Sequence, residues 1–381
     1  MDFELGEDQR MVQELAREFA QNEIAPKAAY HDETGEFPRE ICEKAFEIGL
    51  LNPGLPEAYG GAGMSCMMEC LIAEELAAAC SGISTAMMVN TLATAPLLAG
   101  GTEEQKQQWL TPMTKQLQFA AYGVTEPDAG SDVQGIKTTA VKRGDEYVIN
   151  GRKMWISGAG VADWFFVLTY TNKDAGIRGM SAFVVQAKTA GVTVGKKENN
   201  MGQRASDTRA ITFEDVVVPA ENRIGPEGKG WLLAMAAFDH TRPLVAAGAV
   251  GVARAAMEHA IRYAKERHAF GVAIHRHQAV AFMIADMAKD LDAARLLVWR
   301  AAHIYDQGRK NSYEAACAKC FAADAAMRIC IDAVQIFGGY GFNKEYPVEK
   351  LMRDAKIFQI YEGTSQIQRL IISKGAIAAV K

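Results

Sequence analysis

Apolar residues recur at three- and four-residue intervals in the first third of the chain. The stretches DQRMVQELAREFAQNEIA (8–25) and PREICEKAFEIGL (38–50) show this spacing, and EEQKQQWLTPM (103–113) follows a Gly-Gly-Thr sequence that suits a helix start. An amphipathic helix places residues at such intervals on one face. The pattern therefore predicts a helical N-terminal domain over residues 1–118.

From residue 119 the pattern changes to short runs rich in β-branched and aromatic residues. DWFFVLTY (163–170), MSAFVVQ (180–186) and RAITFEDVVVP (209–219) are typical of strands. DEYVING and RKMWISG meet at Asn150-Gly151, a dipeptide that favours a two-residue turn, so we expect a hairpin there. Residues 119–230 are predicted to form an antiparallel β-domain.

Long amphipathic patterns return over residues 245–268, 277–308 and 312–339, which predicts a helix bundle for residues 231–381. The helix, sheet, helix order lacks the strand-helix alternation of a Rossmann domain. The sequence GAGVAD (158–163) also ends in Asp where the dinucleotide fingerprint requires Gly. The predicted fold class is α+β.

Composition narrows the classes of function. The 381 residues carry 46 acidic and 41 basic side chains without a basic run, which argues against a nucleic-acid-binding surface. No apolar run approaches the roughly 20 residues that span a bilayer, so we expect no membrane partner. The acidic start MDFELGEDQR is unlike a basic leader, so we expect a cytoplasmic protein of bacterial type or a processed mitochondrial form.

Motifs for hydrolases and metal sites are missing from the sequence. There is no Walker-type loop, H-E-x-x-H or G-x-S-x-G. Seven cysteines in a large chain predict reduced thiols, and Cys317 and Cys320 are expected on a buried helix face. His268, His275 and His277 lack ligands at metal spacing, so we expect solvated or hydrogen-bonding histidines and no metal.

Four stretches in order resemble the acyl-CoA dehydrogenase family, and most closely its medium- and short-chain branch. They are YGVTEPDAGSD (122–132), KMWISG (153–158), ERHAFG (266–271) and QIFGGYGF with IYEGTSQIQR (335–342 and 360–369). The resemblance runs essentially from end to end. It implies an N-terminal helical domain, a middle β-domain and a C-terminal helix bundle. It also implies an FAD-dependent homotetramer, a dimer of dimers, that oxidises acyl-CoA to trans-2-enoyl-CoA in fatty acid β-oxidation and passes electrons to electron-transferring flavoprotein.

The first two stretches suit a flavin ring, which needs hydrogen-bond partners at its edge and N5 and a wall against its face. By the resemblance, Thr125 and Ser157 supply the hydroxyls and Trp155 the wall, although the family often has Thr in place of Ser157. Taken alone, Trp155 would be a strand residue in a sandwich core. The other matching positions here are Tyr122, Val124, Gly130, Ser131 and Ile156.

The pyrophosphate of FAD needs cations or helix N-termini, and a planar guanidinium suits it. By the resemblance, Arg267 is that cation, and QIFGG (335–339) is a loop through which a neighbouring subunit approaches the cofactor. Gly338 and Gly339 also suit the end of a helix. The remaining matching positions are Phe270, Gln278, Gln335, Ile336, Thr364 and Gln366.

A single carboxylate, Glu362, lies between Tyr361 and Gly363. The resemblance implies that it is the base that takes the α-proton, and burial would raise its pKa towards the working pH. Spacing alone leaves equally open an acid favoured by the dipole at a helix start. Some branches of the family carry the base at the position of Thr241. The positions that match substrate contacts are Ser131, Asp239, Thr241, Arg242, Tyr361 and Gly363.

The stretch ISTAMMVNTLA (83–93) matches the family segment that lines the far end of the acyl pocket. Met88 and Val89 add apolar volume there, so we expect short to medium straight acyl chains. Two alternatives stay open. One is an acyl-CoA oxidase that uses O₂, for which the chain is short, and the other is a non-catalytic scaffold that binds acyl-CoA or flavin.

Overall fold

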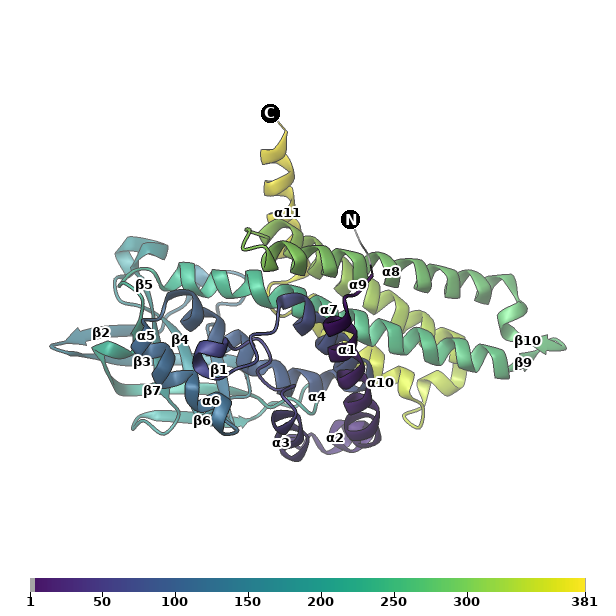
Figure 1. The fold of residues 1–381 in the computed structure, drawn as a ribbon, viewed down its shortest axis with the longest axis horizontal. Helices are drawn as coiled ribbons and strands as arrows, with labels where there is room; N and C mark the ends of the chain where they lie inside the picture. The colour runs from purple at the N-terminus through teal and green to yellow at the C-terminus, as the bar shows by residue number, and fades with distance from the viewer. Residues whose placement is uncertain (1–3, 381) are drawn as a thin grey trace.

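The computed structural model describes residues 4–380, so residues 1–3 and 381, at the outer ends of the predicted first and third domains, lie outside the described residues. The β-domain lies at one end of an elongated molecule and the helix bundle extends to the other, with the N-terminal helices along one side (Figure 1). The helix, sheet, helix order and the α+β class are as predicted.

The N-terminal part is helical. Its helices are α1 (Glu7–Phe19), α2 (Ala28–Thr34), α3 (Arg39–Glu47), α4 (Cys66–Gly100), α5 (Glu103–Trp109) and α6 (Thr111–Lys115). The side chain of Ser65 accepts a hydrogen bond from the N–H of Met68 at the start of α4, which satisfies a free helix donor. The element α4 is broken at Cys80, whose φ of −163° and ψ of 110° are not helical, so it consists of two helices joined at a kink.

The middle part forms one eight-stranded sheet. Its strands are β1 (Ala120–Gly123), β2 (Thr139–Arg143), β3 (Glu146–Ser157), β4 (Trp164–Tyr170), β5 (Met180–Gln186), β6 (Val192–Lys197), β7 (Thr208–Pro219) and β8 (Arg223–Ile224). The order is β6-β7-β3-β2-β4-β5-β8, with β1 beside β4. The pairings are antiparallel except that β1 and β2 each pair with β4 in parallel. Every residue of β4 is buried because alternate side chains enter cores on both faces of the sheet.

The predicted hairpin at Asn150-Gly151 is wrong, because β3 continues through both residues with a register shift against β7. A Cβ at Gly151 would lie 2.4 Å from Thr138 Oγ1, so a close approach of the backbone requires this glycine. The Asn150 side chain exchanges hydrogen bonds of 3.0 and 2.8 Å with Asp215 on β7. The chain turns instead at Gly144, where φ is 62°, between β2 and β3.

The C-terminal part is a helix bundle. Its helices are α7 (Gly230–Glu266), α8 (Gln278–Asp306), α9 (Ser312–Phe337), α10 (Pro347–Ala355) and α11 (Ser365–Ala379), and the short strands β9 (His268–Ala269) and β10 (Val272–Ala273) connect α7 to α8. A Cβ at Gly251 would lie 2.2 Å from Glu74 O, so glycine lets α7 pack directly against α4. Helix α7 starts beside the sheet and runs the length of the bundle (Figure 1), so it can present residues at both ends of the molecule.

By length and composition, α4 and α7 are the helices of the described chain that could cross a membrane. In each, 67% of the apolar window is buried inside the fold. The core helix of a globular protein has the same signature. The predicted lack of a membrane partner stays a prediction.

Candidate functional site

Glu362 lies in a loop whose backbone is left-handed at two consecutive residues, with φ of 51° at Glu362 and 90° at Gly363. The φ of Gly363 favours glycine, and a Cβ there would lie 2.6 Å from Gln368 Nε2, so a larger residue would also displace that amide. The loop ends at Thr364, whose side chain accepts from the N–H of Ile367 and caps α11. Glu362 therefore precedes the cap, and the alternative of a helix-start acid does not describe it.

The carboxylate of Glu362 faces α7. Thr241 Oγ1 donates a hydrogen bond of 2.7 Å to Glu362 Oε2. Burial raises the pKa of the Glu362 carboxyl, and the hydrogen bond from Thr241 and the charges of Arg242 and Lys319 oppose that rise in part. The group is thus a half-buried carboxylate that takes up a proton closer to neutral pH than an exposed glutamate does.

Three side chains hold the peptide carbonyls of Glu362 and Gly363. Arg242 Nε donates to Glu362 O at 3.3 Å, and Gln368 Nε2 donates to Glu362 O at 3.2 Å and to Gly363 O at 2.9 Å. Lys319 Nζ donates to Gly363 O at 2.6 Å. Lys319 lies outside the four stretches that resemble the family, and Gln368 lies in the last of them but is not among the predicted site residues. A signal was present for Lys319, which interrupts an alanine-rich run where a buried lysine needs a partner.

Two predicted substrate residues are already engaged within the chain. Asp239 Oδ2 accepts from Ser312 Oγ at 2.7 Å, which ties its carboxylate to the start of α9. Arg242 is buried, and its guanidinium lies 4.9 Å from the centroid of the Phe238 ring. Arg242 is therefore fixed beside Glu362.

Trp155 departs from the pattern of a sheet residue. It occupies an irregular position in β3 with φ of 61°, and 55% of the residue is exposed. The alternative of a sandwich-core residue is therefore wrong for this side chain. Its neighbour Ile156 is buried in the core of the sheet, whereas Ser157 is half-buried.

The loop after β1 is anchored to β3 beside Trp155. The fully buried Lys153 Nζ donates to Val124 O at 3.1 Å and to Glu126 Oε1 at 2.8 Å. Met154 N donates to Thr125 O at 2.9 Å. The two stretches that resemble flavin contacts are therefore adjacent, and the Lys153–Glu126 pair that joins them does not follow from sequence spacing.

Tyr122 connects this loop to the surroundings of Glu362. Its hydroxyl donates to Ala234 O on α7 at 2.9 Å, and its ring stacks on Phe166 at 4.9 Å between centroids. The centroid of the Tyr122 ring also lies 5.8 Å from that of the Phe238 ring, and the guanidinium of Arg242 lies over the Phe238 ring. The loop and Glu362 thus belong to one continuous set of contacts.

A second group of predicted cofactor residues lies at the other end of α7. Arg267 directly follows α7, about 40 Å along the helix from Thr241. Its guanidinium lies 5.9 Å from the Tyr340 ring centroid, and within residues 4–380 no carboxylate forms an ion pair with it. Gly338, with φ of 60°, ends α9, as expected of a glycine at a helix end. The exposed members of the group are Arg267, Phe270, Gln278, Gln335, Gly338 and Gly339, and Ile336 is buried.

The other predicted cofactor positions are divided between the loop after β1 and the start of α11. Gly130 and Ser131 are exposed beyond the tight turn that begins at Glu126. Thr364 is used as the cap of α11, and Gln366 is exposed in its first turn.

The stretch expected at the end of the acyl pocket lies on the second half of α4. Val89 is buried, whereas Thr85 and Met88 are half-buried on neighbouring turns. Thr85 Oγ1 donates to Gln203 Oε1 at 3.1 Å, and Gln203 Nε2 donates to the Tyr361 hydroxyl at 3.4 Å. This face of α4 is thereby connected to the residue that precedes Glu362.

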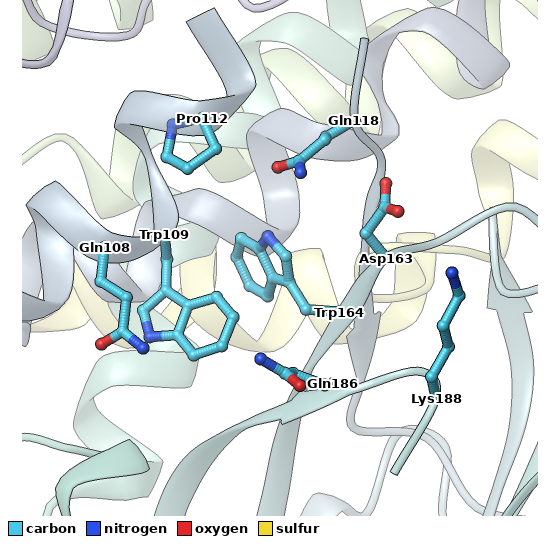
Figure 2. Close-up of a pocket in the computed structure, with 8 residues that line it drawn as sticks. All are labelled: Gln108, Trp109, Pro112, Gln118, Asp163, Trp164, Gln186 and Lys188. Carbon is cyan, nitrogen blue, oxygen red and sulfur yellow. The ribbon is translucent and has the colours of Figure 1, made fainter. Parts of the chain in front are cut away.

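A surface hollow of about 180 Å³ lies elsewhere, between α5 and α6 and the ends of β4 and β5 (Figure 2). Its lining residues are Gln108, Trp109, Pro112, Gln118, Asp163, Trp164, Gln186 and Lys188. None of these is a predicted site residue. The chemistry of the candidate site therefore centres on Glu362 and not on this hollow.

Histidine and cysteine side chains have ordinary structural partners. A ring nitrogen of His268, His275 and His277 lies within 3.0, 3.2 and 3.1 Å of a backbone carbonyl oxygen, which confirms hydrogen-bonding histidines. In the part of the chain that the structure describes, no group of three or more His, Cys, Asp or Glu is placed to hold a metal ion. All seven cysteines are free thiols, and Cys320 is buried while Cys317 is half-buried.

Three family models match the chain in sequence order. The N-terminal domain of acyl-CoA dehydrogenase matches residues 6–116, the middle domain residues 121–216 and the C-terminal domain residues 228–377. A probable medium-chain specific acyl-CoA dehydrogenase of Caenorhabditis briggsae is 49% identical over 98% of this chain and 91% of its own length. A short-chain specific acyl-CoA dehydrogenase of Clostridium acetobutylicum is 44% identical over 98% of this chain and 99% of its own.

Solved structures agree with the sequence relatives. Butyryl-CoA dehydrogenase of Megasphaera elsdenii has a TM-score of 0.96 and 40% identity, over 99% of this chain and 100% of that one. A chain from a study of the electron transferring flavoprotein of Acidaminococcus fermentans has a TM-score of 0.97 and 43% identity, over 99% and 100%. An FAD complex of PigA has a TM-score of 0.95 and 30% identity, over 99% of each chain. This chain belongs to the acyl-CoA dehydrogenase family.

Proposed function

We propose that the protein is an FAD-dependent acyl-CoA dehydrogenase that oxidises short- to medium-chain acyl-CoA to trans-2-enoyl-CoA and passes electrons to electron-transferring flavoprotein. One observation carries the proposal: Glu362 is a half-buried carboxylate outside any helix, bonded to Thr241 and with a pKa raised by burial. The names of the medium- and short-chain relatives and of the butyryl-CoA dehydrogenase support the substrate class. The structural study of electron transferring flavoprotein supports the acceptor.

The α-proton of a thioester is weakly acidic, so its removal needs a well-placed base whose pKa is near the working pH. Thr241 holds Glu362 Oε2, and Oε1 receives no hydrogen bond from the residues that the structure describes. Oε1 is therefore the oxygen that takes the proton. Bound FAD would accept hydride from the β-carbon, which is chemistry that no side chain supplies.

The region around Trp155 fits a flavin. An exposed indole offers an apolar wall, and the half-buried hydroxyls of Thr125 and Ser157 make no hydrogen bond to the described residues. The Lys153–Glu126 pair beneath them holds the loop after β1 against β3. These residues would hold and orient the ring.

Arg267 belongs to the FAD site of another copy in this proposal. It lies about 40 Å along α7 from Thr241, which is further than one extended FAD molecule reaches. We therefore infer that Arg267 and the loop at Gly338 and Gly339 complete the site of a neighbouring subunit in a homotetramer. Phe270 and Phe342 follow the ends of α7 and α9 and are 96% and 90% exposed, which supports a subunit face there.

The domain bounds and the substrate contacts complete the proposal. We propose an N-terminal helical domain (1–118), a middle β-domain with the flavin contacts (119–230) and a C-terminal bundle with the base (231–381), in a cytoplasmic enzyme. Met88 and Val89 limit the acyl chain. Ser131 and Asp239 contact substrate. Arg242 contributes by donating a hydrogen bond to Glu362 O, which holds the loop of the base.

Glu362→Gln should retain FAD and acyl-CoA binding because the amide keeps the shape of the side chain. It should nearly abolish flavin reduction because an amide does not accept a proton at neutral pH. General bases contribute about 10²- to 10⁴-fold, and no second carboxylate stands at Thr241, so we expect a loss of about 10⁴-fold. Anaerobic mixing with butyryl- or octanoyl-CoA, followed by loss of the yellow colour, measures this rate. The exposed Glu345→Gln is the matched control, and bleaching of Glu362→Gln at the wild-type rate contradicts the role of base.

Arg267→Ala should purify with less FAD and as a smaller oligomer, because one guanidinium would neutralise the phosphates of FAD held between two copies. Absorbance at the flavin band and sedimentation velocity measure the two effects. Arg262→Ala removes an exposed arginine from the end of α7, just before Arg267, and should change neither. Full flavin occupancy in an unchanged tetramer would show that Arg267 is not part of the FAD site.

Straight acyl chains from four to about eight carbons should be the best substrates, because each buried methylene contributes about 0.8 kcal/mol until the pocket is full. A panel of acyl-CoA substrates, scored by flavin bleaching and by reduction of electron-transferring flavoprotein, tests this. A preference for dicarboxylic or very long acyl groups would contradict it. Turnover in air that releases hydrogen peroxide and does not need the flavoprotein would identify an oxidase instead.

A further inference from the structure

Lys319 is a fully buried lysine on α9 whose ammonium points at the loop of Glu362. Its Nζ donates to Gly363 O at 2.6 Å. Among residues 4–380 no carboxylate lies within ion-pair distance of this ammonium. By contrast, Lys153, which is also fully buried, is paired directly with Glu126.

A buried cation without a paired anion is costly, because its hydration is lost and only dipoles replace it. Burial lowers the pKa of Lys319 to about 8, and the charge of Glu362 is the strongest influence that opposes this shift. The methylene stem needs no charge to pack among alanines. The reason for burying this ammonium should therefore lie in the group that it contacts, the carbonyl of Gly363.

That group is a strained segment of backbone. Glu362 has φ of 51°, a conformation that costs a side-chain-bearing residue free energy and persists only where its surroundings fix it. The carbonyls of Glu362 and Gly363 are fixed by donors from three helices: Arg242 of α7, Lys319 of α9 and Gln368 of α11. Of the two donors to Gly363 O, Lys319 and Gln368, only Lys319 can carry a charge.

We propose that Lys319 is a positioning residue for the reaction: it holds the Glu362 loop in its left-handed conformation and places a positive charge beside the ionised base. The inference rests on the proposed role of Glu362 as the base. Lys319 does not touch substrate in this account, and it acts through the carbonyl of Gly363.

Positioning of this kind has a signature in the pH profile. The ionisable groups that act on Lys319 are Glu362 in the loop, Arg242 on α7, and Cys320 and Asp324 on α9 itself. The facing residue of α11, Gln368, does not ionise. As the pH rises past about 8 the ammonium loses its proton, so the rate of flavin reduction should fall on the alkaline side.

Lys319→Met keeps the length of the stem and removes the charge. We expect FAD content and the affinity for enoyl-CoA product to be retained, while anaerobic flavin reduction slows about 100-fold, as for a base displaced by about 1 Å. The acid limb of the pH profile should move to higher pH because Glu362 loses a neighbouring cation, and the alkaline decline should disappear. Lys310→Met, an exposed lysine just before α9, is the matched control and should change none of these.

Lys319→Arg provides the second test, and it decides the case if Lys319→Met does not fold. An arginine stays charged at high pH, so most of the rate should return and the alkaline decline should be absent. A wild-type rate with unchanged limbs in Lys319→Met, or an unchanged alkaline decline in Lys319→Arg, would overturn the inference. If one of these results is found, Glu362→Gln shows which proposal is wrong. Flavin reduction by Glu362→Gln at the wild-type rate would mean that Glu362 is not the base, whereas an inactive Glu362→Gln would mean that only the role of Lys319 is wrong.

Discussion

The hydrogen bond from Thr241 to Glu362 is the interaction on which the rest of the site depends. It joins α7, which passes from the sheet through the bundle, to a loop that precedes the last helix. In the conformation that brings Glu362 to Thr241, Glu362 and Gly363 are both left-handed. The strain of that conformation is offset by donors from α7, α9 and α11, so the packing of three helices determines where one carboxylate lies.

Helix α7 contacts or carries residues of each part of the candidate site. Its first turns accept a hydrogen bond from the hydroxyl of Tyr122 on β1, Thr241 and Arg242 lie about a third of the way along it, and Arg267 follows its end. The helical rise of α7 separates Thr241, which binds the proposed base, from Arg267 by about 40 Å. In the proposed assembly, an FAD site is completed by residues from two copies, so catalysis would depend on subunit contacts.

The parts predicted well from sequence are those with strong local patterns. The long helices carry many turns of amphipathic spacing, and the stretches that resemble the family include the loop of Glu362 and the neighbouring segments at Thr125 and Trp155. The prediction failed where a tertiary contact overrides a local preference. Asn150-Gly151 has the signature of a turn, but Thr138 crosses so closely that the glycine serves a continuous strand. Lys319 was not predicted as a site residue because its partner is a backbone carbonyl 44 residues away, and a side-chain motif gives no sign of such a contact.

In the proposed reaction Glu362 acts as a base, and its pKa is raised by burial and held back in part by the hydrogen bond from Thr241. The direct measurement is the pH dependence of anaerobic flavin reduction in the wild-type protein and in Thr241→Val, which removes the hydroxyl at similar volume. A base works in its deprotonated form, so the rate should rise through the pKa of Glu362, above the usual range for glutamate. Loss of the hydrogen bond destabilises the carboxylate, so the acid limb of Thr241→Val should lie at higher pH. Coincident acid limbs in the two proteins, or a limb at the ordinary pKa of an exposed glutamate, would contradict the account.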